Sequence, residues 1–357
     1  MNTGSDRPST PAGDVQPRRH TIPPEWDGMR LDRVLCDLIP DQSRSRLGTW
    51  IRSGEVRVDG EVVERTSHLV RAGTVVEFVP PGDLRRSGGS APIRVIHEDE
   101  HLALIDKPAG VVCHPSEAIS GGTVSEQAVE LFGPLPDPHA ERASEHAGRH
   151  GDDALAGDDE EAEVVANLTA RPGIVHRLDS RTTGIMVIAR SAAAGERLVK
   201  QFAERRVQKT YLALVHGEPR FISDWITAPL IRDARQPDRM SVAREGEGRD
   251  AETFYEVLER FDGFTLVTAK PVTGRTHQIR VHLESIEHPI VGDTVYKGRR
   301  RRQSLPKGAP KMDRQALHAW KLDLEHPVTG EPLHGEAPVP DDLRELVEWL
   351  RANRPKG

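Results

Sequence analysis

Residues 171–184 read Arg-Pro-Gly-Ile-Val-His-Arg-Leu-Asp-Ser-Arg-Thr-Thr-Gly, and the apolar run Ile185-Met-Val-Ile-Ala189 follows directly. The apolar run has the length and the β-branched content of a buried strand. The stretch before it contains Pro, Gly and several cations, which is typical of a loop. We therefore expect Asp179 to lie on a loop held against a buried sheet, a common position for catalytic groups.

The charge of the chain is unevenly distributed. Its 357 residues carry a formal net charge of -7, and this length predicts about two to three domains. Nine carboxylates and two arginines fall between Glu141 and Glu163, whereas residues 299–302 are four consecutive arginines. The negative total therefore does not exclude a nucleic-acid partner.

Cysteine content and hydropathy indicate the compartment. The two cysteines, Cys36 and Cys113, lie far apart and form no Cys-x-x-Cys motif, which argues against a disulfide scaffold and against a zinc site. No apolar run approaches the roughly 20 residues of a membrane span, and the N-terminal segment has no signal-peptide core. We expect a cytoplasmic protein that binds neither a metal nor a membrane.

Residues 25–82 show a small helix-helix-strand pattern. Apolar residues at helical spacing predict a helix within Arg30–Ile39, a second helix follows Ser43, and Asp59-Gly60 forms a turn between short strands. This module resembles an S4 RNA-binding domain. Considered alone, the arginines near its second helix fit an ordinary solvated face, but the resemblance implies that they contact RNA phosphates. These arginines are Arg44, Arg46 and Arg52.

The remaining segments complete the expected organisation. Residues 1–24 are polar and predict a disordered tail, and residues 83–91 have the composition of a linker. From residue 92 to residue 357, strands interleave with helices and hairpin turns, which predicts an α+β domain with a mixed, largely antiparallel sheet. Within it we expect an acidic loop insertion and a basic loop. The two loops span about residues 134–165 and about residues 298–315.

Three segments of the second domain occur in a recognisable order. They are Lys107-Pro-Ala-Gly110, His176-Arg-Leu-Asp179 with Thr183-Gly184, and Thr273-Gly-Arg-Thr-His-Gln-Ile-Arg-Val-His282 with His288-Pro-Ile-Val-Gly-Asp293. In order and approximate spacing they resemble the RluA-type pseudouridine synthases. Together with the S4-like module, the resemblance covers about residues 28–350. It is strongest to the members that modify large-subunit (23S) ribosomal RNA.

The resemblance implies that uridine in RNA is isomerised to pseudouridine without a cofactor. The target nucleotide must then leave the base stack and enter a pocket. Asp179 would be the catalytic carboxylate, and the sequence leaves open whether it attacks the sugar, attacks the base or removes a sugar proton. Because burial raises the pKa of a carboxyl group, an ionised Asp179 needs a cation, and the resemblance implies Arg280. The alternative for Arg280 is a salt bridge to Glu284, four residues later.

Further site residues follow from the same resemblance. Tyr211 would stack on the uracil and help to remove the proton from its ring carbon, whereas the alternative is a core tyrosine of a strand. Independently of the resemblance, the residue pattern places Ser191 and Thr276 as caps of the helices that follow them. We expect several residues to position the loop or to contact RNA. These are His176, Arg177, Thr183, Lys107 and the basic run Arg299, Arg300, Arg301 and Arg302.

Three other functions remain as alternatives. The same enzyme class could act on transfer RNA, since the motifs are shared between the two substrates. The chain could also be a non-catalytic RNA-binding or ribosome-assembly factor, although a pure binder needs no carboxylate facing an anionic ligand. A glycosidase would require a second positioned carboxylate, which the motifs lack. We expect RNA, or a ribosomal precursor, as the partner of a monomeric protein.

Overall fold

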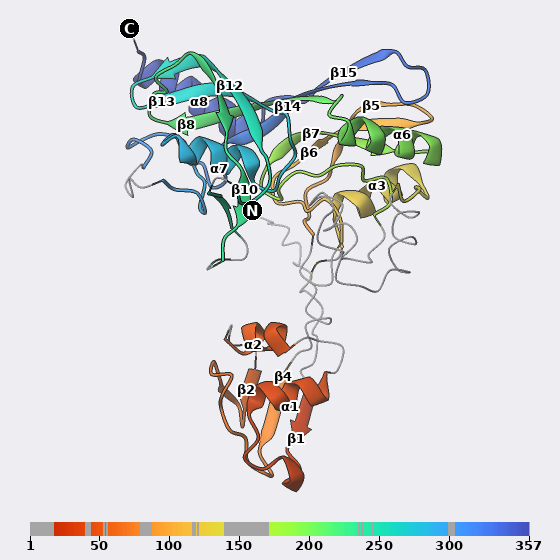
Figure 1. Cartoon of the computed structure of the whole chain (residues 1–357), viewed down its shortest axis with the longest axis vertical. Coiled ribbons are helices and arrows are strands. Elements are labelled where there is room, and N and C mark those ends of the chain that lie inside the picture. Colours follow the sequence, from red (N-terminus) through yellow and green to blue (C-terminus); the bar gives the residue numbers. More distant parts are fainter. Residues whose placement is uncertain are drawn as a thin grey trace, which may run out of the picture. The chain divides into compact units, whose positions relative to one another are not determined.

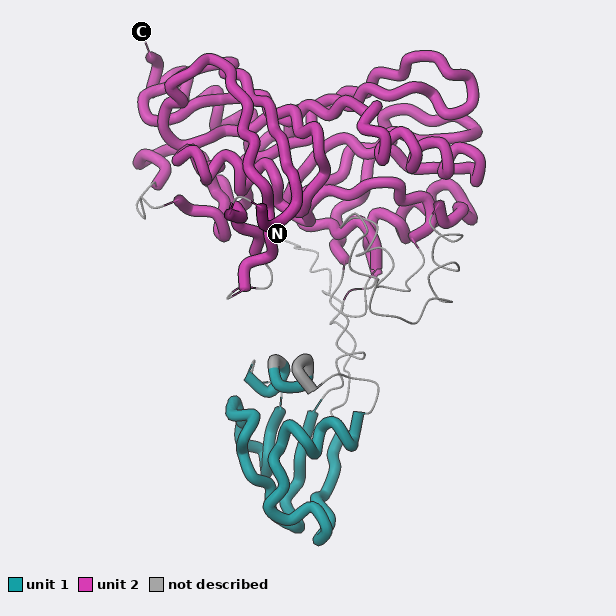
Figure 2. The backbone as a smooth tube through the Cα atoms, in the orientation of Figure 1, with its two compact units in different colours: residues 1–86 teal, residues 87–357 magenta. Residues whose placement is uncertain are grey.

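The computed structural model describes residues 18–39, 44–52, 54, 56–78, 88–115, 119, 121–138, 171–234, 236, 239–244, 246–298 and 304–356, without the side chains of residues 44–46 and 49. The chain divides into two compact units, Met1–Arg86 and Ser87–Gly357 (Figure 2). In the ranges just given, no helix has both the length and the hydrophobicity needed to cross a membrane.

Unit 1 packs two helices against a four-stranded sheet with the order β1-β4-β2-β3. Leu31, Val34 and Leu35 recur at helical spacing and are buried, so that the first helix is anchored through one face. Trp50 of the second helix packs edge-on against Phe78 of the sheet, with ring centroids 5.8 Å apart. The elements are β1 (Arg18–Thr21), a 3-10 turn (Pro24–Trp26), α1 (Leu31–Leu38), α2 (Arg44–Arg52), β2 (Val56–Val58), β3 (Glu61–Val62) and β4 (Val75–Phe78).

The structure corrects the expected N-terminal tail. The chain enters the fold at Arg18, where β1 pairs antiparallel with β4. Ile22 is buried among the core residues of unit 1. The prediction of a disordered segment over residues 1–24 is therefore wrong from residue 18 onward, because one apolar side chain and a strand partner fix this stretch. Residues 1–17 lie outside the described residues.

Unit 2 is built on a nine-stranded sheet with the path β5-β6-β7-β14-β8-β13-β12-β9, and β15 pairs with β14. Only β7 and β14 run parallel among the described pairs, so the prediction of a mixed, largely antiparallel α+β fold is confirmed. The strands are β5 (Arg94–Glu98), β6 (Leu102–Lys107), β7 (Thr183–Ala189), β8 (Gln208–His216), β9 (Ser223–Thr227), β10 (Leu230–Arg232), β11 (Met240–Val242), β12 (Glu252–Phe261), β13 (Phe264–Pro271), β14 (Leu317–Glu325) and β15 (Pro332–Glu336). The helices are α3 (Val124–Phe132), α6 (Ala192–Ala203), α7 (Gln278–Ser285) and α8 (Asp341–Asn353).

Two hydrophobic clusters divide the sheet of unit 2. As Figure 1 shows, α3 and α6 lie beside the half with β5, β6 and β7, and α7 and α8 lie beside the half with β8, β12 and β13. Tyr211 of β8 packs against both clusters, so it marks the middle of the sheet. At the same place Gly184 of β7 pairs with Ala319 of β14, where a Cβ would lie 2.1 Å from the Ala319 carbonyl oxygen. Only glycine allows this close approach.

Capping of α6 follows the sequence. Ser191 accepts a hydrogen bond from the backbone N–H of Ala194, which confirms the predicted cap.

Three boundaries of the expected linker and loops differ in the described residues. Gly88 exchanges backbone hydrogen bonds with Gly121 and Val112, so residues 88–91 belong to unit 2, while residues 83–87 lie outside the described residues. Pro136 accepts a hydrogen bond from Gly173, which ties the start of the expected acidic loop to the sheet. Residues 139–165 of that loop lie outside the described residues. The end of the expected basic loop, residues 312–315, is largely buried in the core.

Candidate active site

A cavity of about 260 Å³ lies in unit 2 between the 171–182 loop, β8 and the start of α7. Among the described residues that line it, Asp179 is the single carboxylate. Six cationic side chains share the lining. They are Arg171, Arg177, Arg205, Lys209, Arg275 and Arg280. A cavity of this charge favours an anionic ligand, and its one acidic group requires a compensating partner.

The loop that carries Asp179 is held by the segment after β6. The backbone N–H of Leu178 donates to Sγ of Cys113, at 3.3 Å, and the carbonyl of Ser180 accepts from the backbone N–H of Gly110, at 2.8 Å. A turn closes between the Asp179 carbonyl and the Thr182 N–H. Asp179 is therefore fixed from both sides in sequence, although 24% of its side chain is exposed in the cavity.

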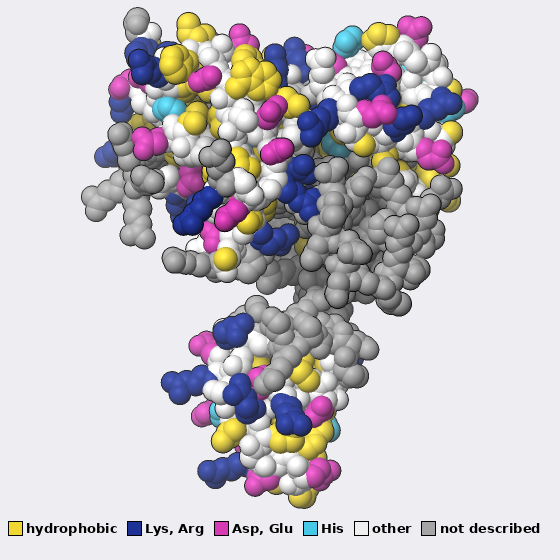
Figure 3. Space-filling view, in the orientation of Figure 1, with side chains coloured by type: hydrophobic (Ala, Val, Ile, Leu, Met, Phe, Trp, Pro, Cys, Tyr) yellow, Lys and Arg dark blue, Asp and Glu magenta, His cyan; other side chains and the backbone are white. Residues whose placement is uncertain are grey.

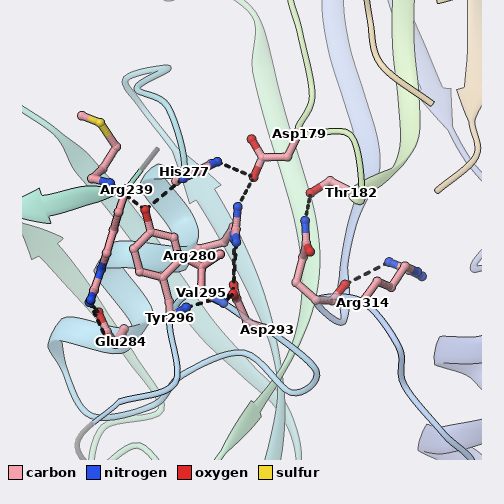
Figure 4. Close-up of polar contacts among 12 residues, drawn as sticks. Asp179, Thr182, Arg239, His277, Arg280, Glu284, Asp293, Val295, Tyr296 and Arg314 are labelled. Carbon is pink, nitrogen blue, oxygen red and sulfur yellow. Dashed lines mark hydrogen bonds and ion pairs between the residues drawn. The ribbon is translucent and has the colours of Figure 1, made fainter. Parts of the chain in front are cut away.

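Arg280 connects two carboxylates (Figure 4). Its Nη1 donates to Oδ2 of Asp179 at 2.9 Å, while Nε and Nη2 donate to the two carboxylate oxygens of Asp293 at 2.7 and 3.0 Å. Burial opposes the charge of Arg280, but the hydrogen bonds and negative charges of Asp293 and Asp179 outweigh it, so the pKa of Arg280 is raised. The guanidinium therefore stays charged and is aimed at Asp179 by its paired contact with Asp293.

Asp293 is the residue that sequence reasoning missed. Its side chain is completely buried, and besides Arg280 it accepts the backbone N–H groups of Val295 and Tyr296 at 2.9 and 3.0 Å. A second carboxylate near Arg280 could have been expected, because a buried arginine that faces a functional carboxylate needs a second counter-charge to hold its orientation. The ring of Tyr296 lies under the guanidinium, with 4.9 Å between Cζ of Arg280 and the ring centroid.

The start of α7 differs from the prediction. His277 adopts a left-handed conformation with φ 57 and ψ 14, and the helix begins at Gln278 without a side-chain cap, so the predicted cap at Thr276 is wrong. The Thr276 hydroxyl instead accepts from Nη2 of Arg177 at 2.8 Å, which holds Arg177 at the cavity wall. Glu284, the alternative partner of Arg280, pairs with Arg239.

Two other predicted residues share the cavity with Asp179. Tyr211 and His176 both line the cavity. The His176 ring stacks on Phe202 with centroids 4.6 Å apart, and its Nε2 accepts the backbone N–H of Val187 at 3.0 Å. Burial, assisted by the charge of Lys209, lowers the pKa of His176 to about 3. His176 is thus a neutral ring that supports the loop.

Lys107 and Thr183 do not reach the cavity, which corrects their expected contact with RNA. Lys107 is 0% exposed, and its Nζ donates to the carbonyls of Pro108, Val111 and Ser180. Burial lowers the pKa of this ammonium group to about 8. Thr183 is 5% exposed and its hydroxyl lies 2.9 Å from Nδ1 of His318. Both residues lie at sheet positions that are covered on each face. Strand periodicity alone does not distinguish such positions from exposed ones.

The remaining cations are located only in part. Arg299, Arg300, Arg301 and Arg302 and the side chains of Arg44 and Arg46 lie outside the described residues. Arg52 ends α2 with an exposed side chain. Figure 3 shows arginine side chains on the visible face of unit 1, which contains no lysine. Among the described residues of this unit, the exposed arginines are Arg18, Arg19, Arg30, Arg33, Arg52, Arg57, Arg65 and Arg71.

Comparison with known protein families gives a separate match for each of the two units. The profile of a family described as RNA pseudouridylate synthase matches residues 101–285, and the S4 domain profile matches residues 29–76. Ribosomal large subunit pseudouridine synthase D of Xanthomonas campestris pv. campestris is 38% identical over 359 residues, 97% of this chain and 96% of that protein. The protein of the same name from Pseudomonas aeruginosa is 37% identical over 96% of this chain and 98% of its own length. A solved structure, human RNA pseudouridylate synthase domain containing 4, shares the fold with a TM-score of 0.52 and 24% identity, over 72% of this chain and 93% of that one.

Proposed function

This chain belongs to the RNA pseudouridylate synthase family, and we propose that its substrate is uridine in large-subunit ribosomal RNA. It is an isomerase that transfers uracil from a nitrogen link to a carbon link on the ribose. The relatives that match 96–97% of this chain are named ribosomal large subunit pseudouridine synthase D, and the S4 domain supplies a surface with exposed arginines. We expect the protein to act as a monomer in the cytoplasm.

We propose Asp179 as the catalytic carboxylate. The observation that carries this proposal is its position as the one carboxylate among the described lining residues, held by Arg280 at 2.9 Å. The hydrogen bond engages Oδ2, which leaves Oδ1 for the substrate. The fixed guanidinium holds the carboxylate in one orientation, so that no reorganisation is needed during the reaction. Arg280 is a catalytic partner in this scheme, and Asp293 is a positioning residue.

Tyr211 and the cavity cations receive the flipped nucleotide in this proposal. The Tyr211 ring offers a stacking surface for uracil, and its hydroxyl can take the proton that leaves the ring carbon. Arg177, held by Thr276, is placed to contact a phosphate or to fill the position that the flipped nucleotide leaves in the RNA. In this proposal Arg44, Arg46, Arg52 and Arg299–Arg302 add phosphate contacts. These contacts contribute to affinity and not to the chemical step.

Pseudouridine mapping in cells tests the proposal. Ribosomal and transfer RNA are compared between cells without the protein, cells complemented with the native chain, and cells complemented with Asp179→Asn. We expect at least one large-subunit site to disappear without the protein and to return only with the native chain. Loss confined to transfer RNA would assign the other substrate. Restoration by Asp179→Asn would identify a binding or assembly factor.

A further inference from the structure

A chain of hydrogen bonds fixes the protonation of His277 at the cavity wall (Figure 4). Tyr296 is completely buried, and its hydroxyl oxygen accepts the backbone N–H of Met240 at 2.8 Å. The same oxygen lies 2.9 Å from Nδ1 of His277. A backbone N–H can only donate, so the phenolic proton needs an acceptor, and in the described part of the chain Nδ1 of His277 is the group within reach.

The consequence is a neutral imidazole that carries its proton on Nε2. Burial lowers the pKa of His277, which agrees with this neutral form. Nε2 lies 3.9 Å from Oδ2 of Asp179, too far for a hydrogen bond, and Oδ2 already accepts from Arg280. Within the described residues, the Nε2–H group therefore faces the cavity without a hydrogen-bond partner, immediately beside the proposed catalytic carboxylate.

We propose that Nε2–H of His277 donates a hydrogen bond to a carbonyl oxygen of the flipped uracil. This inference rests on the proposed function. When the bond between N1 and C1′ breaks, its electron pair remains with uracil and spreads over the two carbonyl oxygens. The ring then bonds to C1′ through C5, after which C5 loses its proton and N1 gains one. A donor fixed at a carbonyl oxygen is worth most while the detached base is negatively charged.

A neutral donor suits this position better than a cationic one. Asp179 already has Arg280 at 2.9 Å, and a second cation beside it would compete for the same carboxylate. Imidazole donates without adding charge, in the way that a neutral histidine polarises a carbonyl in other enzymes. Tyr296 acts through His277 as a positioning residue, because its hydroxyl selects the tautomer that has the proton on Nε2.

The backbone conformation of His277 allows substitutions that remove its ring without straining the main chain. His277 has φ 57, a left-handed value that glycine and asparagine adopt readily. His277→Gly and His277→Asn therefore remove the donor ring without forcing the backbone. Glu287→Gly is the matched control, because Glu287 has the same kind of conformation, with φ 67, just beyond the other end of α7, and its exposed side chain is not part of the cavity lining.

Single-turnover conversion of large-subunit RNA from cells lacking the protein is measured with excess full-length enzyme, together with RNA affinity and thermal unfolding. We expect both His277 variants to slow conversion about 100-fold, with affinity within about threefold, and Glu287→Gly to convert at the native rate. A folded His277 variant that converts within about threefold of the native rate overturns the proposal. A native enzyme that converts no uridine refutes the proposed function instead.

The role of Tyr296 is tested by a double-mutant cycle. Tyr296→Phe should slow conversion about tenfold when His277 is present and should have no further effect in the His277→Gly background. Equal effects in both backgrounds would show that Tyr296 does not act through His277.

Discussion

Asp179 and Asp293 share one guanidinium, yet their replacement by asparagine should affect different properties. Asp293→Asn should mainly lower the stability of the protein, and Asp179→Asn should mainly abolish its activity. Asp293 is completely buried and receives two hydrogen bonds from Arg280, so Asp293→Asn leaves a buried cation with one remaining, partly exposed carboxylate. Removing one partner of a buried ion pair costs about 3–5 kcal/mol. In Asp179→Asn the buried pair with Asp293 remains intact, and the free energy of unfolding should change by less than about 1 kcal/mol.

The expected shifts in unfolding temperature are large enough to measure. The unfolding entropy of a unit of this size is about 0.6 kcal/mol/K, so Asp293→Asn should lower the midpoint of unit 2 by about 5–9 °C. Asp179→Asn should lower it by about 2 °C or less. Calorimetry of the full chain resolves the two variants, and RNA conversion is measured in parallel.

Activity should show a different order from stability. Asp179→Asn should abolish conversion in a protein of native stability, whereas Asp293→Asn should retain a slower reaction because Arg280 is still present but no longer aimed. Equal midpoints of thermal unfolding for the two variants would refute the proposal that Arg280 makes one structural contact, with Asp293, and one catalytic contact, with Asp179. A fully active Asp293→Asn protein would show that the orientation of Arg280 does not matter.

Three further predictions follow from individual residues. Arg280→Lys keeps the charge but loses the forked contact with two carboxylates, and should slow single-turnover conversion about 100-fold; conversion at the native rate would show that charge alone suffices. Burial lowers the pKa of His318 from 6.5 to about 4, so the unfolded chain binds more protons between these values and the free energy of unfolding falls as the pH drops from 6.5 to 4. His318→Gln should remove up to about 1.4 kcal/mol per pH unit of this dependence in urea titrations, and an unchanged slope would refute it. Alanine at Arg299–Arg302 should make the slope of log affinity against log salt shallower by up to about 3, whereas an unaltered slope would remove this segment from the RNA interface.

The contact between Arg280 and Asp179 could be expected before the structure because the resemblance to the RluA-type pseudouridine synthases implies it. The second contact of Arg280 could not, since the pairing with Asp293 depends on the path of the chain after α7. Periodicity also failed at Thr276, where the left-handed backbone of His277 starts the helix one residue late. Such a conformation of a residue other than glycine depends on tertiary packing and leaves no local sequence signal.

The burial of two polar residues also could not be predicted from the sequence. Lys107 and Thr183 belong to motifs, and motif membership suggested contact with RNA. The structure buries both where β6, β7 and β14 meet, with Lys107 bonded to carbonyls and Thr183 to His318. Lys107 therefore supports the Asp179 loop through the Ser180 carbonyl, and Thr183 connects β7 to β14.

The most direct measurement of the central claim is release of tritium from RNA labelled at C5 of uridine, because forming the new carbon link must expel that hydrogen. Native protein in excess should release the label from large-subunit RNA in a single turnover. Asp179→Asn should release none while binding the same RNA within about tenfold of the native affinity, since phosphate contacts provide most of the binding. Release by Asp179→Asn, or loss of its RNA binding in proportion to its loss of release, would contradict the assignment of Asp179 as the reacting carboxylate.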